Sequence, residues 1–230
     1  AGCDVLCEKP FVYDPHRAAD ELLDEARQLI DMAATAGKAL GLCSQYAVTA
    51  ERCRELLGRP AGQPVTEFRG CLASPARGRA ADPAIVWFDL GPHLLAAAQA
   101  LAPDADLDPA SVEVEAADFS VVAHFALVRP DAPPLRCRVH VHRTHAEPSH
   151  IRQLELDGVP FDIQGGKDSD GLYGARIVSG NRTVEDLDPL RLTIRRMLVG
   201  QPSIQGAAIH RNMELLLAFA RRLPPAGTNA

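Results

Sequence analysis

The sequence has few aromatic residues, no long uninterrupted hydrophobic run and no excess of positive charge. Aromatic side chains make up 5% of the 230 residues, so aliphatic side chains must fill most of the core. No stretch approaches the roughly 18 consecutive apolar residues of a membrane-spanning helix, and we expect no membrane segment. The net charge is −6 without a lysine or arginine cluster, which argues against nucleic-acid binding because phosphate contacts need basic residues.

The sequence also lacks paired cysteines and a recognisable secretion signal. Its six cysteines are scattered without a C-x-x-C pair, unlike the dense cysteines of small disulfide-rich proteins. Residues 1–4 contain no basic segment followed by an apolar one. We therefore expect free thiols and a cytoplasmic location.

The hydrophobic pattern predicts two structural parts. Alternating strands and helices at the start are typical of a parallel α/β sheet, whereas the later part is mainly β structure with a hairpin at Asp157-Gly158. We expect an α+β fold with residues 1–48 as an α/β unit and residues 49–230 as a domain with a mainly antiparallel sheet. The predicted elements are strands at 5–7, 39–46 and 65–74, a helix capped by Asp14 and ended by Gly37, helices at 49–57, 92–101 and 206–223, and strands over most of 111–184.

Lys9 directly follows the first predicted strand, in the motif Glu8-Lys9-Pro10. Ligands of open parallel sheets bind beyond the carboxyl ends of the strands, where this lysine is expected. Its ammonium group can donate a hydrogen bond to a hydroxyl or carbonyl oxygen. A surface lysine in a turn is the alternative for this motif alone.

Asp89 and His93 lie four residues apart around Pro92. Proline is favoured in a first helical turn, so we expect a helix to begin near Gly91 with both side chains at its mouth. A histidine can exchange a proton near neutral pH, and a nearby carboxylate can orient it. The alternative is a capping aspartate beside a structural histidine.

Together the two motifs resemble the Gfo/Idh/MocA oxidoreductases, through V-L-C-E-K-P at residues 5–10 and D-x-G-x-H at residues 89–93. The resemblance implies that Lys9, Asp89 and His93 line a site where hydride passes between NAD or NADP and a sugar-like alcohol. It also implies that residues 1–48 correspond to part of a Rossmann domain, and that the open face of the second domain's sheet forms a homodimer.

Further contacts are expected around this site. Tyr46, Gln45 and Trp87 are the predicted substrate contacts, with a core position as the alternative for Tyr46. Glu8 and Pro10, which flank Lys9, are the predicted cofactor contacts.

The sequence departs from that family in having no G-x-G-x-x-G turn, whose backbone would approach a dinucleotide pyrophosphate. We therefore expect a truncated member that binds no cofactor as it stands. It would be an accessory protein that holds a small molecule, or a peptide by strand addition, or else a non-redox acid/base enzyme. The alternative is a fragment of an oxidoreductase that uses NAD or NADP.

Four basic side chains alternate along one predicted strand and should share one face of the sheet. This row lacks a carboxylate or cysteine at a spacing typical of metal ligands, so we predict no metal site and favour a solvated or dimer-interface face. The residues are Arg136, Arg138, His140 and His142.

Overall fold

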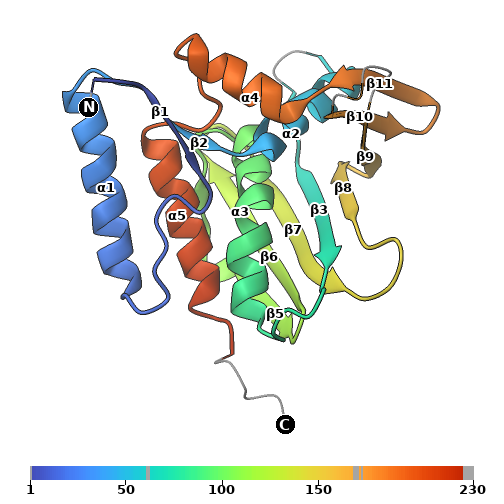
Figure 1. The fold of residues 1–230 in the computed structure, drawn as a ribbon. Helices are drawn as coiled ribbons and strands as arrows, with labels where there is room; N and C mark the ends of the chain where they lie inside the picture. Colours follow the sequence, from blue (N-terminus) through green and yellow to red (C-terminus); the bar gives the residue numbers. More distant parts are fainter. Residues whose placement is uncertain (1, 61–62, 168–170, 172, 225–230) are drawn as a thin grey trace.

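The computed structural model describes residues 2–60, 63–167, 171 and 173–224. Within these ranges the chain forms a two-stranded sheet, a nine-stranded sheet and five α-helices. Helices α1 (Ala19–Thr35), α3 (Pro83–Leu101) and α5 (Ala207–Ala220) lie as a layer in front of the large sheet (Figure 1).

The small sheet pairs β1 (Val5–Glu8) with β2 (Leu40–Cys43) in parallel, and α1 connects the two strands. Helices α2 (Gln45–Leu56) and α4 (Pro189–Leu198) contact each other near its edge. The strands of the large sheet are β3 (Glu67–Pro75), β4 (Asp106–Leu107), β5 (Glu113–Ala117), β6 (Ser120–Arg129), β7 (Ala132–Thr144), β8 (Ile151–Leu156), β9 (Val159–Lys167), β10 (Tyr173–Ser179) and β11 (Arg182–Leu187).

The large sheet has the strand order β11-β10-β9-β8-β3-β7-β6-β4, with β5 also paired to β6. Its neighbouring strands pair antiparallel, apart from β3 and β7 at the centre, which are parallel. The predicted α+β class with a mainly antiparallel sheet is therefore confirmed.

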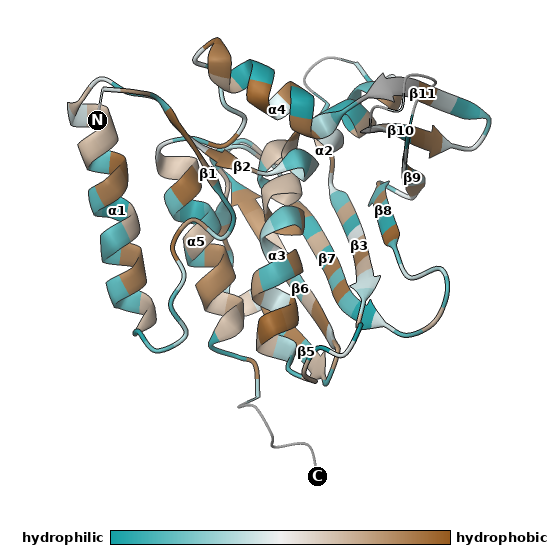
Figure 2. Ribbon diagram, viewed as in Figure 1, coloured by the Kyte–Doolittle hydropathy of each residue, from teal (hydrophilic) through white to brown (hydrophobic). Residues whose placement is uncertain are grey.

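The two faces of the large sheet differ in chemistry because side chains alternate along each strand. On β7, Leu135, Cys137, Val139 and Val141 are buried on the helix side, while the residues between them point to the open face. Figure 2 shows this alternation of hydrophobic and hydrophilic residues along β3 and β7. The hydrophobic core therefore lies between the sheet and the helices.

Helix α3 is the central core helix, and it begins earlier than predicted. Asp82 caps it by accepting from the backbone N–H of Ala84 at 2.8 Å, and Pro83 occupies its first turn. The predicted start near Gly91 is wrong, because Pro92 lies inside a helix held by packing on several sides. Helix α3 is also long and apolar enough to cross a membrane, but most of it is buried within the protein.

Other helix boundaries also differ from the prediction. The Asp14 carboxylate accepts from the backbone N–H of His16 at 2.9 Å, which forms a local turn, and α1 begins later without a side-chain cap. Helix α2 begins already at Gln45. Sequence reasoning missed α4, although Asp188-Pro189 carries the same capping signal as α3. The predicted stop at Gly37 is confirmed by its φ of 62°.

The first 48 residues share one hydrophobic cluster with the rest of the chain. Leu22 and Ala26 of α1 and Leu42 of β2 belong to the same buried cluster as Phe219 of α5. The predicted division after residue 48 falls within α2, and it stays a prediction. All six cysteines are free thiols, as expected.

The predicted hairpin joins β8 and β9 through Asp157 and Gly158, which have φ values of 47° and 81°. Two positive φ angles are typical of a tight type I′ turn. The Asp157 carboxylate also accepts from the backbone N–H groups of Thr66 at 3.0 Å and Glu67 at 2.7 Å, and pairs with Arg59. The turn therefore anchors the start of β3.

We expect Asp157→Ala to lower the free energy of unfolding by about 1–3 kcal/mol, because two partly buried N–H groups lose a charged acceptor. Asp157→Asn keeps an acceptor oxygen and should cost less. Burial raises the pKa of Asp157, but hydrogen bonds from Thr66 and Glu67 outweigh burial and lower the pKa below the ordinary 3.8. The ionised carboxylate therefore stabilises the fold above pH 3.8, and this contribution is lost in stronger acid. Urea unfolding measures this, with Asp131→Ala in an exposed turn as the control. Equal stability of Asp157→Ala and the control would contradict it.

Candidate functional site

Lys9 meets Asp89 at the carboxyl end of β1. Its ammonium group donates to the backbone carbonyl of Asp89 and lies 3.2 Å from the carboxylate Oδ1. The Lys9 side chain is only 14% exposed. The structure thus brings together two motifs that are 80 residues apart in the sequence.

The Asp89 carboxylate is shared by three basic side chains. Its Oδ2 accepts from Arg143 at 3.0 Å and from Arg79 at 3.3 Å, in addition to the Lys9 contact at Oδ1. Burial raises the pKa of Asp89, but Lys9 and Arg143 outweigh burial and hold it below the ordinary 3.8. Asp89 therefore stays ionised, and it orients the cations around it.

His93 lies one helical turn after Asp89 on α3, which places the two side chains on one side of the helix. Burial, helped by Lys9 and Arg152, lowers the pKa of its imidazole to about 3, against the opposite effect of Asp89. Its Nδ1 atom is buried and has no hydrogen-bond partner among the described residues. His93 is therefore a neutral imidazole with one buried ring nitrogen that these residues leave unpaired.

Tyr46 packs on His93, with ring centroids 5.1 Å apart. It lies in the first turn of α2 and not at the end of a strand, is 5% exposed, and burial raises its pKa to about 12. Its position is therefore that of a core residue that supports His93. Gln45 is half-buried beside it at the start of α2.

Trp87 lies in the hydrophobic core and not at the candidate site. The indole is fully buried, donates to the backbone carbonyl of Leu216 at 3.0 Å, and packs edge-on against Phe219. A Cβ at position 91 would come within 3.0 Å of this ring, so a glycine is needed there. The predicted substrate contact at Trp87 is thus replaced by a role in core packing.

The residues that flank Lys9 have different surroundings. Glu8 is exposed at the end of β1, and its carboxylate adds to burial in raising the pKa of the Cys43 thiol, at the end of β2, to about 11. Pro10 is half-buried, and the Lys9–Pro10 peptide is cis. Both lie at the edge of the candidate site.

Arg143 is the residue that sequence reasoning missed. Its side chain is only 2% exposed, and it follows the buried apolar positions of β7 with the same alternation. An arginine in a series of core-facing positions needs a buried partner, and that signal was present in the sequence.

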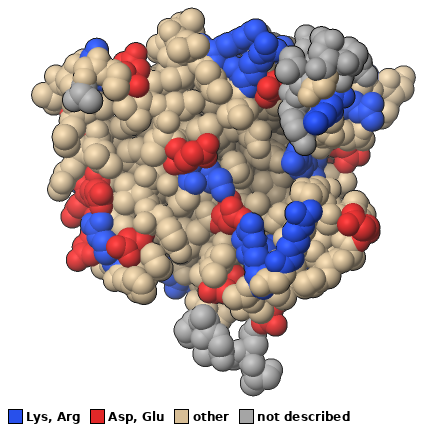
Figure 3. Space-filling model, in the orientation of Figure 1, with Lys and Arg blue, Asp and Glu red and all other residues tan. Residues whose placement is uncertain are grey.

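Basic groups outnumber acidic ones around His93. Lys9, Arg79 and Arg143 surround the Asp89 carboxylate. Arg152 acts on His93, as Lys9 also does. Figure 3 shows basic and acidic side chains alternating across the middle of this face. The candidate site is therefore suited to a ligand with an oxygen-rich or anionic group.

No family model matches the sequence, and no curated protein matches it. Several solved structures share its fold. The UDP-N-acetylglucosamine 3-dehydrogenase GnnA from Acidithiobacillus ferrooxidans is 18% identical, with a TM-score of 0.69 over 96% of this chain and 71% of that chain.

Two further structures were determined with ligands. The WlbA (WbpB) dehydrogenase from Thermus thermophilus, in complex with NAD and UDP-GlcNAcA, is 16% identical, with a TM-score of 0.59 over 100% of this chain and 67% of that chain. An inositol dehydrogenase homologue from Azotobacter vinelandii, with NADH and myo-inositol, is 12% identical, with a TM-score of 0.59 over 96% and 69%. These neighbours are Gfo/Idh/MocA-family dehydrogenases, and the chain shares their fold.

Proposed function

We propose that the chain binds a hydroxyl or carbonyl group of a sugar-like substrate between Lys9 and His93 and exchanges a proton with it. The observation that carries this proposal is the free Nδ1 atom of a neutral, buried His93, one helical turn from the Lys9–Asp89 ion pair. The sugar-like substrate class is supported by the fold, because the structural neighbours include dehydrogenases of a UDP-sugar and of inositol.

In this proposal each residue has one role. Lys9 donates a hydrogen bond to the substrate oxygen, and Asp89 holds the ammonium group in place from α3. The neutral His93 ring has one lone pair and one N–H group, so it can accept a proton from the substrate or donate one to it. Tyr46 keeps the ring in position by packing on it.

The surplus of basic side chains favours a substrate that also carries an anionic group. A phosphate or carboxylate near Lys9 and Arg152 would offset two charges that now lower the pKa of His93. Binding of such a substrate would therefore make His93 a stronger base while the substrate is present.

A nicotinamide dinucleotide would supply or accept hydride when bound, but the start of helix α1 does not fit its pyrophosphate. Helix α1, which follows β1, carries Asp20 and Glu21 in its first turn, and these carboxylates repel a pyrophosphate at the helix N-terminus. No G-x-G-x-x-G turn occurs in the sequence. The proposed proton transfer therefore needs no hydride from this cofactor, and Glu8 and Pro10 lie only at the edge of the proposed site.

Two candidate functions share this substrate site. Ligand binding or non-redox proton transfer is favoured by the acidic start of α1. Sugar oxidoreduction with NAD or NADP is favoured by the shared fold, and the parallel β1–α1–β2 unit supports the assignment of residues 1–48 to part of a dinucleotide-binding fold.

Titration with NADH and NADPH, followed by nicotinamide fluorescence, separates the two candidates. We expect no saturable binding, because the carboxylates in the first turn of α1 repel a pyrophosphate. Saturable binding that Lys9→Met weakens would instead establish the oxidoreductase.

We expect Lys9→Met to weaken binding of UDP-N-acetylglucosamine, or of myo-inositol, by about 10- to 100-fold, the usual effect of losing one charged hydrogen bond. Isothermal titration calorimetry measures the change. Lys38→Met, at the opposite end of the small sheet, is the matched control. If neither ligand binds, or if both variants bind like the original protein, the proposed sugar-like substrate is wrong.

The pKa of His93 gives a second test of the site. Because burial is the largest cause of its low value and Lys9 the next, Lys9→Met should raise the pKa above about 3 but leave it below the ordinary 6.5. NMR of labelled histidines measures it, with exposed His16 as the internal reference. The unfolded chain binds a proton at His93 near pH 6.5, whereas the folded chain does so only near pH 3. The contribution of neutral His93 to stability is therefore lost as pH falls below 6.5. A His93 that titrates near the ordinary 6.5 would contradict this description of the site.

We further propose that the chain forms a homodimer through the open face of the large sheet. This face carries the ion pairs Arg69–Glu155 and Arg136–Glu67, so basic and acidic groups alternate across it and can pair with a second copy. Sedimentation velocity should show a dimer that Arg138→Glu weakens. A monomer at all tested concentrations would contradict the proposal.

A further inference from the structure

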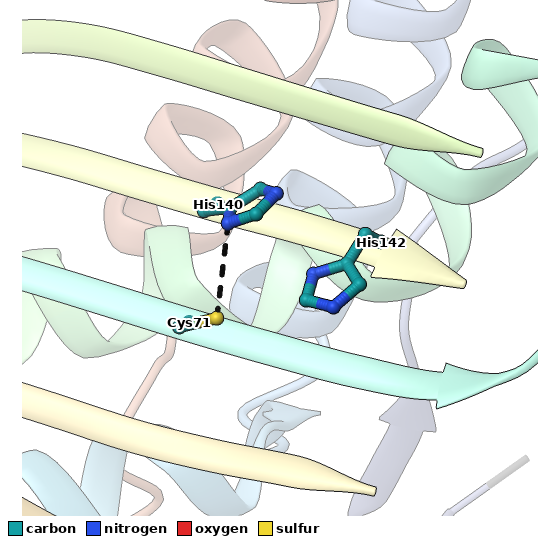
Figure 4. A group of neighbouring side chains, drawn as sticks. All are labelled: Cys71, His140 and His142. Carbon is teal, nitrogen blue, oxygen red and sulfur yellow. Dashed lines mark hydrogen bonds between the residues drawn. The ribbon is translucent and has the colours of Figure 1, made fainter. Parts of the chain in front are cut away.

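Three metal-ligand side chains meet on the open face of the large sheet, away from the site above. Cys71 of β3 and His140 of β7 are partners in the parallel register, and His142 follows two residues later on the same face. Cys71 Sγ lies 3.9 Å from His140 Nδ1. The dashed line in Figure 4 marks this contact. The ligand atoms of all three residues lie within 4.8 Å of one another.

The two imidazoles are held in place by their neighbours. Ser120 of β6 contacts His140 Nε2 at 3.0 Å, which leaves Nδ1 directed at the thiol. The His140 and His142 rings stack with centroids 4.5 Å apart. His142 Nδ1 is buried, and no described residue gives it a hydrogen-bond partner. A hydrogen bond to the second ring nitrogen is the usual way that a protein orients a histidine ligand.

The protonation of these groups also suits a metal ion. Burial lowers the pKa of His140 to about 4 and also lowers that of His142, so both rings are neutral and keep a lone pair at neutral pH. Burial raises the pKa of the Cys71 thiol, although Arg138 opposes this effect. A metal ion must therefore displace one proton, from the thiol to solvent, as the metal–sulfur bond forms.

We propose that Cys71, His140 and His142 bind one Zn²⁺ ion. Tetrahedral zinc has bonds of about 2.3 Å to sulfur and about 2.0–2.1 Å to nitrogen, which place its ligand atoms about 3.3–3.6 Å apart. The present separations need only side-chain rotation to reach that geometry, because the strands already fix the three backbones. One thiolate and two imidazoles satisfy three of the four zinc positions.

The fourth position points away from the sheet, since all three ligands come from the sheet itself. Water fills it in a single chain, and a group from a second molecule can take its place. Arg138 on the same face opposes a divalent cation, and the Cys71 thiolate offsets one of the two positive charges of the ion.

Cobalt titration of the full chain under reducing conditions tests the site, because Co²⁺ bound by thiolate gives a charge-transfer band and strong visible bands. We expect one Co²⁺ per chain, displaced by Zn²⁺. Cys71→Ser should abolish the charge-transfer band and weaken binding at least ~100-fold, and Ser120→Ala should weaken it about 10-fold. Cys7→Ser, at another half-buried thiol, and His124→Gln, on the same face, are the matched controls and should bind like the original chain.

Thiol alkylation of the original chain gives a test that needs no variant. Zn²⁺ should protect Cys71 from iodoacetamide and leave the exposed Cys3 as reactive as before, as measured by mass spectrometry. Equal alkylation of Cys71 with and without Zn²⁺, or a charge-transfer band that survives in a folded Cys71→Ser variant, would overturn the proposal.

Discussion

The arrangement of the candidate site depends on the Asp89 carboxylate. Arg143 is almost completely buried on β7, and a buried guanidinium is costly unless an anion lies beside it. Asp89 supplies that anion from α3 and also receives Lys9 from the end of β1. One carboxylate therefore connects the small sheet, the central helix and the large sheet, and it fixes where His93 lies relative to Lys9.

Strand β7 contributes to two separate groups because its side chains alternate between the faces of the sheet. Arg143 points to the helix side and meets Asp89, whereas His140 and His142 point to the open face beside Cys71. The parallel pairing of β3 and β7 sets Cys71 directly opposite His140. A shift of one residue in this register would exchange the two faces and destroy both groups.

The shared fold and the local electrostatics carry different information about function. The fold is shared with GnnA and WlbA, and it supports the proposal of a substrate near Lys9 and His93. The charges near these residues favour an anionic or oxygen-rich substrate, while the acidic first turn of α1 disfavours a pyrophosphate. These charges therefore support the proposed substrate site more than a cofactor site.

Local patterns in the sequence determined the class of the fold, the hairpin at Asp157-Gly158 and the stop of α1 at Gly37, because these depend on alternation and on positive φ angles. They also indicated Lys9, Asp89 and His93 as one group, through two short motifs. The helix start at Gly91 was mispredicted because the local preference of Pro92 is weaker than the packing of α3 in the core.

Only the tertiary structure decided which distant side chains meet. The burial of Trp87, the pairing of Arg143 with Asp89, and the approach of Cys71 to His140 all depend on strands and helices far apart in the chain. The spacing of residues in a sequence predicts which side chains are neighbours on the same helix or strand. Contacts between different elements depend on the order and register of the strands. These are fixed by the packing of the whole hydrophobic core.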